Sequence, residues 1–306
     1  MEDVLGPEYS ATRLPLQADA EGEVVATLVS RRGPSPSGKA VLYVHGFTDY
    51  FFQTHLADFY VERGFDFYAL DLRKYGRSLL PHQTPNFALS MSDYFEEIDE
   101  AVRIIRADHD VLLVNGHSTG GLITALWADR VKGEGKLQGL FLNSPFFDLN
   151  VPAALRLVGD GLAWTLRRPR PYAKLPSSVS TAYAQSIHAD HSGEWTFDLT
   201  WKPLGGFPVR AAWLAAIRRG QRRLQKGLGI DVPVLVMSSA RTEKPSTEAA
   251  ADIVLDVRHI ARWSDGLGPQ VKLVQIEGGL HDLVLSAKPV REEVFAELDR
   301  WLTTSL

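Results

Sequence analysis

Short runs of apolar residues recur along the chain and are separated by more polar segments with helical spacing. Many of these runs are rich in β-branched and aromatic residues, which favour strands. Strands that alternate with helical segments are typical of a mostly parallel sheet with helices on both faces. The pattern predicts an α/β fold, in which an antiparallel edge strand precedes the core strands, at Glu23–Ser30, Ala40–Val44, Phe67–Leu70, Val111–Val114, Gly139–Leu142, Val232–Met237 and Val271–Ile276.

Apolar residues at helical spacing predict helices between and after these strands. Asp93, with a glutamate three residues later, is typical of a helix start, and the apolar positions that follow extend to Ile105. Pro208 suits a first helical position, and an apolar stripe follows it. A last helix, with an apolar face from Val290 to Leu302, should close the chain.

The rhythm of strands stops between Pro145 and Phe207. This stretch is rich in Pro, Trp, Tyr, Arg and His instead. We interpret it as a cap inserted into the core. The expected organisation is a first part of the core at residues 1–145, a cap at residues 146–207 and a second part of the core at residues 208–306.

The segment from Val111 to Ile123 combines an apolar strand, a tight turn and the apolar start of a helix. The turn contains the pattern Gly116-x-Ser118-x-Gly120. A strand-to-helix turn of this kind strains the backbone of the central serine, and glycines two residues away on each side remove side chains that would clash. The sequence therefore predicts Ser118 as a nucleophile exposed at the end of a strand.

A serine hydroxyl needs a base within hydrogen-bond reach and a third group that orients the base. His281 has the best position, because it follows the last predicted strand in a loop, where sites in such sheets gather. The acid should follow the strand Val232–Met237, since serine, acid and histidine occur in this order in such folds. Asp252 is our choice, because the apolar residues after it would anchor it, and Asp256 and Glu243 are alternatives.

The negative charge that develops on a substrate carbonyl oxygen needs preorganised N–H donors. The N–H of Thr119, directly after the nucleophile, is one candidate. The second should come from the loop after the first parallel strand, where Gly46 allows a close approach of the backbone. The sequence therefore predicts the N–H groups of Thr119 and Phe47 as an oxyanion hole.

Several short motifs occur in a fixed order between residues 40 and 302, at His45–Phe47, Asp71–Ser78, Gly116–Gly121, Pro233–Met237, Asp252–Asp256 and Gly279–Asp282. In this combination the chain resembles the α/β-hydrolase superfamily, and more narrowly its branch of monoacylglycerol lipases, lysophospholipases and serine-aminopeptidase-like hydrolases. The resemblance implies an eight-stranded core, a mobile and mainly helical cap, and a Ser-acid-His mechanism without a cofactor or metal. Members usually carry Gly-x-x-Asp soon after the seventh strand, whereas a longer stretch without that glycine precedes Asp252 here.

Composition narrows the range of partners. The 306 residues carry a net charge of −4, with 33 Lys and Arg against 37 Asp and Glu, so no electrostatic argument favours a nucleic acid. The absence of cysteine excludes disulfides, thiolate metal sites and a cysteine nucleophile. Residues 1–16 do not resemble a signal peptide, and no stretch approaches the roughly 20 apolar residues of a membrane span. We therefore expect a cytoplasmic location without an integral membrane span.

These features together predict a hydrolase that acts on a small-molecule acyl ester. The cap carries many large apolar side chains, and ligand sites are mostly apolar, so we expect Phe146, Phe147, Trp164 and Trp201 to bind a hydrophobic group of small to medium size. A peptidase, amidase or acyltransferase with the same triad is the first alternative, because the pocket decides the substrate. A ligand-binding protein on a hydrolase scaffold is less favoured, since the predicted triad is intact.

Overall fold

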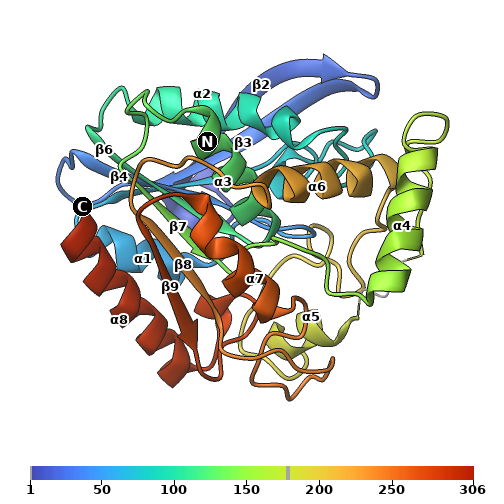
Figure 1. The fold of residues 1–306 in the computed structure, drawn as a ribbon. Coiled ribbons are helices and arrows are strands. Elements are labelled where there is room, and N and C mark those ends of the chain that lie inside the picture. The colour runs from blue at the N-terminus through green and yellow to red at the C-terminus, as the bar shows by residue number, and fades with distance from the viewer. Residues whose placement is uncertain (1, 177–179) are drawn as a thin grey trace.

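A single sheet forms the centre of the molecule (Figure 1). The computed structural model describes residues 2–176 and 180–306. Within them, nine strands lie in the order β1-β2-β3-β5-β4-β6-β7-β8-β9. Neighbours from β5 to β9 pair in parallel, whereas β1, β2 and β3 form an antiparallel end of the sheet that joins β5. The strands are β1 Glu2–Asp3, β2 Gly6–Asp19, β3 Gly22–Arg31, β4 Lys39–Val44, β5 Asp66–Asp71, β6 Val111–His117, β7 Gly139–Asn143, β8 Val234–Ser239 and β9 Val271–Ile276.

All seven predicted strands are present, and the antiparallel position of β3 is as expected. The strand β2, 14 residues long, was not predicted. It lies near the edge of the sheet and buries only Tyr9 and Leu14, so it lacks a regular alternation of apolar and polar residues. Pro15 within it also argues against a strand in the sequence. The expected number of eight strands is exceeded because the two-residue β1 pairs with the start of β2.

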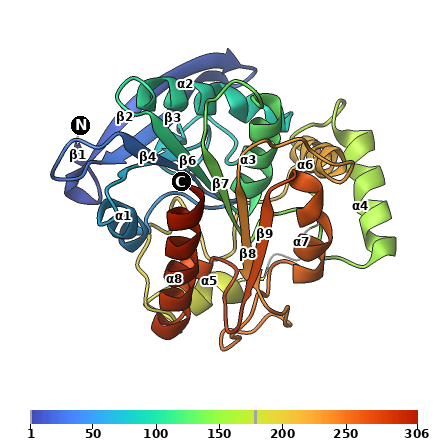
Figure 2. The same cartoon turned by 60° about the vertical axis from the view of Figure 1, so that its left-hand side comes forward.

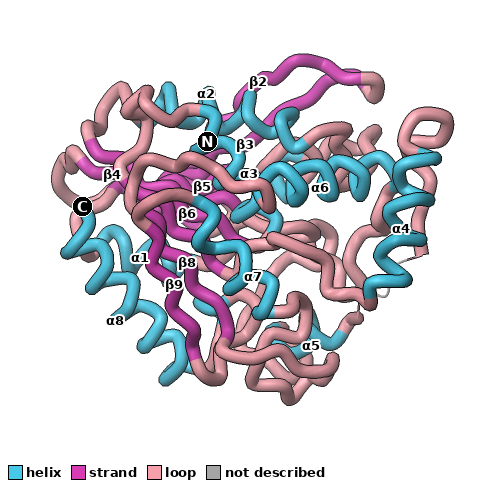
Figure 3. Tube along the Cα trace, viewed as in Figure 1, coloured by secondary structure: helices cyan, strands magenta, loops and turns pink. Residues whose placement is uncertain are grey.

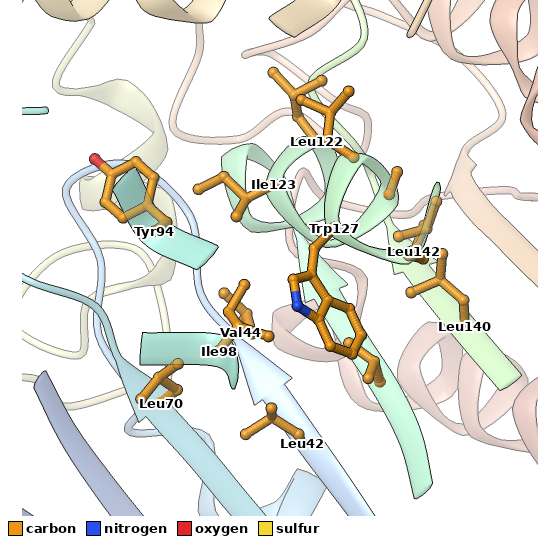
Figure 4. Packing of buried hydrophobic residues seen from close by; sticks show 14 of the residues in the cluster. Leu42, Val44, Leu70, Tyr94, Ile98, Leu122, Ile123, Trp127, Leu140 and Leu142 are labelled. Carbon is orange, nitrogen blue, oxygen red and sulfur yellow. The ribbon is translucent and has the colours of Figure 1, made fainter. Parts of the chain in front are cut away.

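Helices cover both faces of the sheet (Figures 1 and 2). Buried residues of α2, α3, α6 and α7 pack with Leu42 and Val44 on one face, and those of α1 and α8 pack with Val41 and Tyr43 on the other. Figure 4 shows Trp127 of α3 among the leucines and valines of the first face. The helices are α1 Thr54–Val61, α2 Phe95–Ile105, α3 Thr119–Arg130, α4 Ala153–Leu166, α5 Ala182–Ile187, α6 Ala211–Leu224, α7 Val257–Ser264 and α8 Lys288–Ser305.

Two of the predicted helix starts are displaced. A 3₁₀ turn at Met91–Tyr94 precedes α2, and the capping box consists of Ser90 and Asp93, one helical turn before the expected position. The helix α6 begins at Ala211, three residues after Pro208. The C-terminal helix is as predicted, with an apolar face that packs on the sheet.

The described residues of the segment 146–207 form two helices and long loops. The described part of this segment has 14 residues in α4 and 6 in α5, and Figure 3 shows that loops and turns connect them. The helix α4 lies beside α6 at the outside of the molecule (Figures 1 and 2). Among the helices of the described chain, none has the length and apolar character that crossing a bilayer would require.

Candidate active site

Ser118 lies in a sharp turn between a strand and a helix. The strand β6 ends at His117 and α3 begins at Thr119. Ser118 has φ 52° and ψ −116°, a conformation that is strained for a residue with a side chain. The backbone N–H of Ser118 donates to the carbonyl of Asn143, the last residue of β7, at 3.0 Å. The turn is therefore held by the neighbouring strand.

Glycines allow the backbone to pass close to this turn. A Cβ atom on Gly120 would lie 2.3 Å from the carbonyl oxygen of Val44, at the end of β4. A Cβ atom on Gly46 would lie 2.9 Å from the Cβ of Ser118. Both distances are shorter than atoms can approach, so glycine is required at both positions. The loop after β4 therefore lies directly against the predicted nucleophile.

Three side chains from distant parts of the sequence are joined by two hydrogen bonds. The Oγ of Ser118 lies 3.0 Å from Nε2 of His281, and Nδ1 of His281 lies 2.9 Å from Oδ2 of Asp252. The other oxygen of Asp252, Oδ1, accepts from the backbone N–H groups of Val254 and Leu255. A carboxylate only accepts, so Nδ1 of His281 carries a proton and Nε2 is free to accept from the serine hydroxyl.

The alternative acids have other partners. Asp256 is the N-cap of α7, where it accepts from the backbone N–H of Arg258 and pairs with the guanidinium of the same residue. Glu243 pairs with Arg241 at 2.8 Å. Of these three acids, Asp252 is thus the one that reaches His281.

His117 is adjacent to Ser118 in sequence but does not bond to its hydroxyl. Its Nδ1 lies 3.2 Å from the carbonyl oxygen of Asn143, and its ring centre lies 5.0 Å from that of His281. Burial lowers the pKa of His117. His117 is therefore a buried neighbour of the His281 ring and not a hydrogen-bond partner of Ser118.

One predicted oxyanion donor, Thr119, directly follows the nucleophile, and the other, Phe47, lies in the loop that contacts the nucleophile turn. The imidazole of His45 is buried, and Nε2 accepts from the N–H of Leu72 at 3.1 Å, so Nδ1 is the protonated nitrogen and donates to the carbonyl of Gly46 at 2.8 Å. In a planar trans peptide the C=O of Gly46 and the N–H of Phe47 point in opposite directions. The ring of His45 thus fixes the direction of the Phe47 N–H. Within the described chain, neither this N–H nor that of Thr119 donates to a protein acceptor.

The four predicted substrate-binding residues have different positions. Phe146 is half-buried, and its N–H donates to the carbonyl of Ser118 at 2.9 Å. The side chain of Phe147 is completely buried in the core, so we assign it to packing rather than to substrate binding. Trp164 is 48% exposed on α4. Trp201 packs edge-on against the ring of Tyr50, which lies in the loop after β4. Of the four, Phe146 is the one hydrogen-bonded to the nucleophile turn.

Sequence reasoning missed several polar residues around His281. Asn143 donates to Asp282 at 2.7 Å, and the N–H of Asp282 donates to the hydroxyl of Tyr183 from α5. The Tyr183 ring lies edge-on to His281 at 5.5 Å. Burial alone would raise the pKa of Asp282, but His117 and hydrogen bonds from Gln53 and Asn143 lower it. A polar residue at the end of a buried strand was a signal for Asn143, whereas no local pattern pointed to Tyr183.

One group of side chains in the described residues has the composition of a metal site. Ligand atoms of Asp49, His117 and Asp282 lie within 4.8 Å of one another. Asp49 accepts from the ammonium of Lys202 at 2.7 Å, and Asp282 accepts from two amide side chains. These donors compensate the negative charge that would attract a cation, so the group is better described as a polar network next to His281 of the predicted triad.

Known proteins share this architecture. The monoglyceride lipase of Saccharomyces cerevisiae, solved with a substrate analogue, is 17% identical and superimposes with a TM-score of 0.73 over 97% of this chain and 95% of its own. The monoacylglycerol lipase of Paleococcus ferrophilus is 18% identical, with a TM-score of 0.69 over 91% of this chain and 99% of its own. These similarities show that the chain has the α/β-hydrolase fold.

Sequence comparison leads to the same group of proteins. Phospholipase YtpA of Bacillus subtilis is 22% identical over 213 residues, which are 67% of this chain and 73% of that protein. The family described as serine aminopeptidase, S33, matches residues 35–286. The chain therefore belongs to this family of α/β hydrolases.

Proposed function

We propose that this protein is a serine hydrolase that cleaves a carboxylic ester with a hydrophobic group of small to medium size. The observation that carries the proposal is the pair of hydrogen bonds from Ser118 to His281 and from His281 to Asp252. The base lies within hydrogen-bond reach of both the nucleophile and the orienting acid, which is the geometry that nucleophilic catalysis by serine needs. Residues 146–207 act as the cap over this site.

In the proposed reaction, the Oγ of Ser118 attacks the ester carbonyl while Nε2 of His281 takes the hydroxyl proton. The carbonyl π electrons move to the oxygen, whose charge is stabilised by the N–H groups of Phe47 and Thr119. The C–O bond to the alcohol then breaks, and His281 returns the proton to the departing alkoxide. Water repeats the sequence on the acyl-enzyme, releases the acid and restores Ser118. Asp252 stabilises the imidazolium that forms in each step.

The relatives favour ester hydrolysis over the alternatives. Two of the structures with a similar fold are named monoglyceride or monoacylglycerol lipases, and the bacterial relative is named a phospholipase. The family description, serine aminopeptidase, keeps peptide hydrolysis as a second candidate. The same triad serves both reactions, so the substrate must be decided by assay. The backbone of Phe146 is hydrogen-bonded to Ser118 and its side chain is half-buried, so Phe146 is our candidate contact for a hydrophobic acyl group.

The decisive experiment combines a substrate panel with variants of the triad. The wild type should hydrolyse p-nitrophenyl esters and should be labelled by a fluorophosphonate at Ser118. Ser118→Ala should lower kcat by roughly 10⁵- to 10⁶-fold, and Asp252→Asn by about 10³- to 10⁴-fold, because triad residues act as a unit. Asp256→Asn is the matched control, since Asp256 caps α7, and it should retain activity. Turnover confined to peptide amides would contradict the ester assignment, and Ser118→Ala with more than a tenth of the wild-type rate would contradict the triad.

A further inference from the structure

The loop after β4 is attached to the end of the cap at successive residues. This loop carries Phe47, whose N–H is one of the proposed oxyanion donors. Three polar contacts join it to residues 198–207, which lie about 150 positions later in the chain. The contacts are Phe207 N to Thr48 Oγ1 at 3.1 Å, Lys202 Nζ to Asp49 Oδ1 at 2.7 Å, and Asp198 N to Tyr50 Oη at 2.7 Å.

The contact between Lys202 and Asp49 is a buried ion pair. The Lys202 side chain is 7% exposed and that of Asp49 is 4% exposed. In the described residues, the ammonium of Lys202 is the one cation that pairs with Asp49. Removal of one partner of a buried pair leaves a charge without compensation, which is strongly unfavourable. The pair therefore constrains the separation of cap and loop more tightly than an exposed ion pair would.

The loop also contains a strained residue beside Phe47. Thr48 has φ 51°, in the left-handed region that residues with a side chain rarely adopt. Such a conformation persists only where the surrounding contacts hold it. The N–H of Thr48 donates to Asn86 at 3.1 Å, and its hydroxyl accepts from Phe207 of the cap. Contacts from the core and from the cap therefore hold the peptide that follows the oxyanion donor.

We propose that Lys202 is a positioning residue for the oxyanion hole. Its ammonium holds the carboxylate of Asp49, the residue that directly follows the strained Thr48. Asn86 and Phe207 hold Thr48 itself, whose N–H belongs to the peptide bond that follows Phe47. The ring of His45 fixes the preceding peptide, Gly46–Phe47, through the carbonyl of Gly46. The cap thus acts on the transition state through Lys202 without contacting the reacting atoms. This inference rests on the proposed function, since it concerns the same nucleophile.

A positioning role predicts a specific kinetic effect. The hydrogen bond from Phe47 N–H strengthens as charge develops on the carbonyl oxygen, so its misplacement affects the transition state more than the bound substrate. Removal of an oxyanion donor costs about 10²- to 10³-fold in kcat, and displacement of a reacting group by 1 Å can cost about 10²-fold. A loosened loop should therefore lower kcat while KM changes little.

The test uses the full chain with Lys202→Met, which keeps an unbranched side chain one atom shorter and removes the charge. We expect kcat for p-nitrophenyl esters to fall about 10- to 100-fold, with KM within about twofold. The rate of fluorophosphonate labelling of Ser118 should fall in parallel, because this reaction also places negative charge on an oxygen in the same hole. The labelling rate does not depend on which substrate is natural, so it tests the positioning role of Lys202 even if the ester assignment fails.

The double variant Lys202→Met with Asp49→Asn separates positioning from stability. It removes the uncompensated carboxylate, so the melting temperature should recover towards that of the wild type while kcat stays low. The matched control is Arg218→Met, which breaks comparably buried ion pairs from α6 to Asp148 at the start of the cap and to Asp160 of α4, and it should lower stability without lowering kcat. Recovery of kcat together with stability in the double variant, or an unchanged kcat and labelling rate in folded Lys202→Met, would overturn the proposal. A wild type that neither hydrolyses the panel nor is labelled would overturn the proposed function as well.

Discussion

The two halves of the cap, the first with α4 and the second comprising residues 181–207, differ sharply in how they are attached to the rest of the molecule. The first half contains α4, of which Ala163 is the one residue that is completely buried. A small apolar cluster that includes Ala163 of α4 and Ala215 of α6 joins it to the core, and Arg218 of α6 pairs with Asp148 and Asp160. Large apolar side chains on α4 remain exposed, namely Leu155 (64%), Leu157 (73%), Val158 (69%), Leu162 (40%) and Trp164 (48%).

The second half is anchored by aromatic packing and by hydrogen bonds. The Trp195 ring stacks on His55 of α1 at 4.3 Å, and its Nε1 donates to the carbonyl of Leu285 at 2.9 Å. Phe197 packs against Phe52 of the same loop that carries Asp49. The attachments of Lys202 and Tyr183 described above lie in this half too. Residues 181–207 are therefore firmly attached to the core, whereas α4 lies on its surface.

The difference shows that one insertion contains a firmly attached segment, residues 181–207, and a loosely attached helix, α4. Regions with few buried apolar contacts open locally at a lower free energy than the core. Opening of the cap should therefore begin at α4, while the half that holds the oxyanion loop stays in place. This division lets substrate access vary without disturbing the position of Phe47.

The largest expected effect concerns a glycine in the second half. A Cβ atom at Gly193 would lie 2.0 Å from the backbone carbonyl carbon of Ile187, which cannot move aside as a flexible side chain can. Gly193→Ala should therefore lower the free energy of unfolding by about 3 kcal/mol, the upper range for overpacking. Urea denaturation measures it. Gly205→Ala is the matched control in the same half, because a Cβ there meets no atom within 4 Å and it should be nearly neutral. Equal stability of the two variants would show that the second half is not tightly packed.

A smaller effect should appear when the pH falls below neutrality. His55, under Trp195, is largely buried, and burial lowers its pKa, while a hydrogen bond to the Val284 carbonyl opposes this change. In the unfolded chain the pKa is about 6.5, so below this pH the unfolded state binds a proton that the folded state does not. The contribution of His55 is thus present above pH 6.5 and is lost as pH falls, by up to about 1.4 kcal/mol per pH unit.

The ion pair between Asp148 and Arg218, which helps to attach the first half of the cap, should respond to pH in a different range. Burial raises the pKa of Asp148, but Arg218, a backbone N–H and Arg156 together lower it by more, so the net pKa is below its usual value. Its contribution is present above about pH 3.9 and is lost only as pH falls through the lowered value. A change from pH 7.0 to 5.5 should therefore weaken the attachment of the second half while the Asp148 pair persists, and urea denaturation at both pH values measures this. His55→Gln should reduce the slope of the free energy of unfolding against pH, and an unchanged slope would contradict the assignment.

The sequence was most informative where the chain is buried on both sides. Parallel strands such as β4 and β6 read as continuous apolar runs, and the turn around Ser118 combines a strand end with obligatory glycines. The edge strand β2 was missed because one side of it faces solvent and carries polar residues. The choice among Asp252, Asp256 and Glu243 stayed open, since it depends on how the loop after β8 folds back.

Long-range contacts were beyond the reach of local patterns. Lys202 and Asp49 are 153 positions apart, and nothing near either residue in the sequence indicates its partner. Phe147 shows the converse error, because a large apolar residue at the start of the cap was expected at the substrate and lies in the core. Apolar composition identifies a residue that avoids water, but the fold decides whether core or ligand covers it.

The smallest expected effect concerns two glycines on α4. A Cβ at Gly159 or Gly161 meets no atom within 4 Å, and neither residue has a positive φ. Alanine in a helix interior is favoured over glycine by roughly 0.5–1 kcal/mol, because glycine loses more backbone freedom on folding. Each Gly→Ala change should therefore stabilise α4, the opposite sign from Gly193→Ala. Since α4 opens locally, the gain should appear as slower hydrogen exchange of α4 amides, with little change in the midpoint of global unfolding. A loss of protection would mean that another part of the protein fills the space beside these glycines in solution, and α4 would then be no less anchored than the second half.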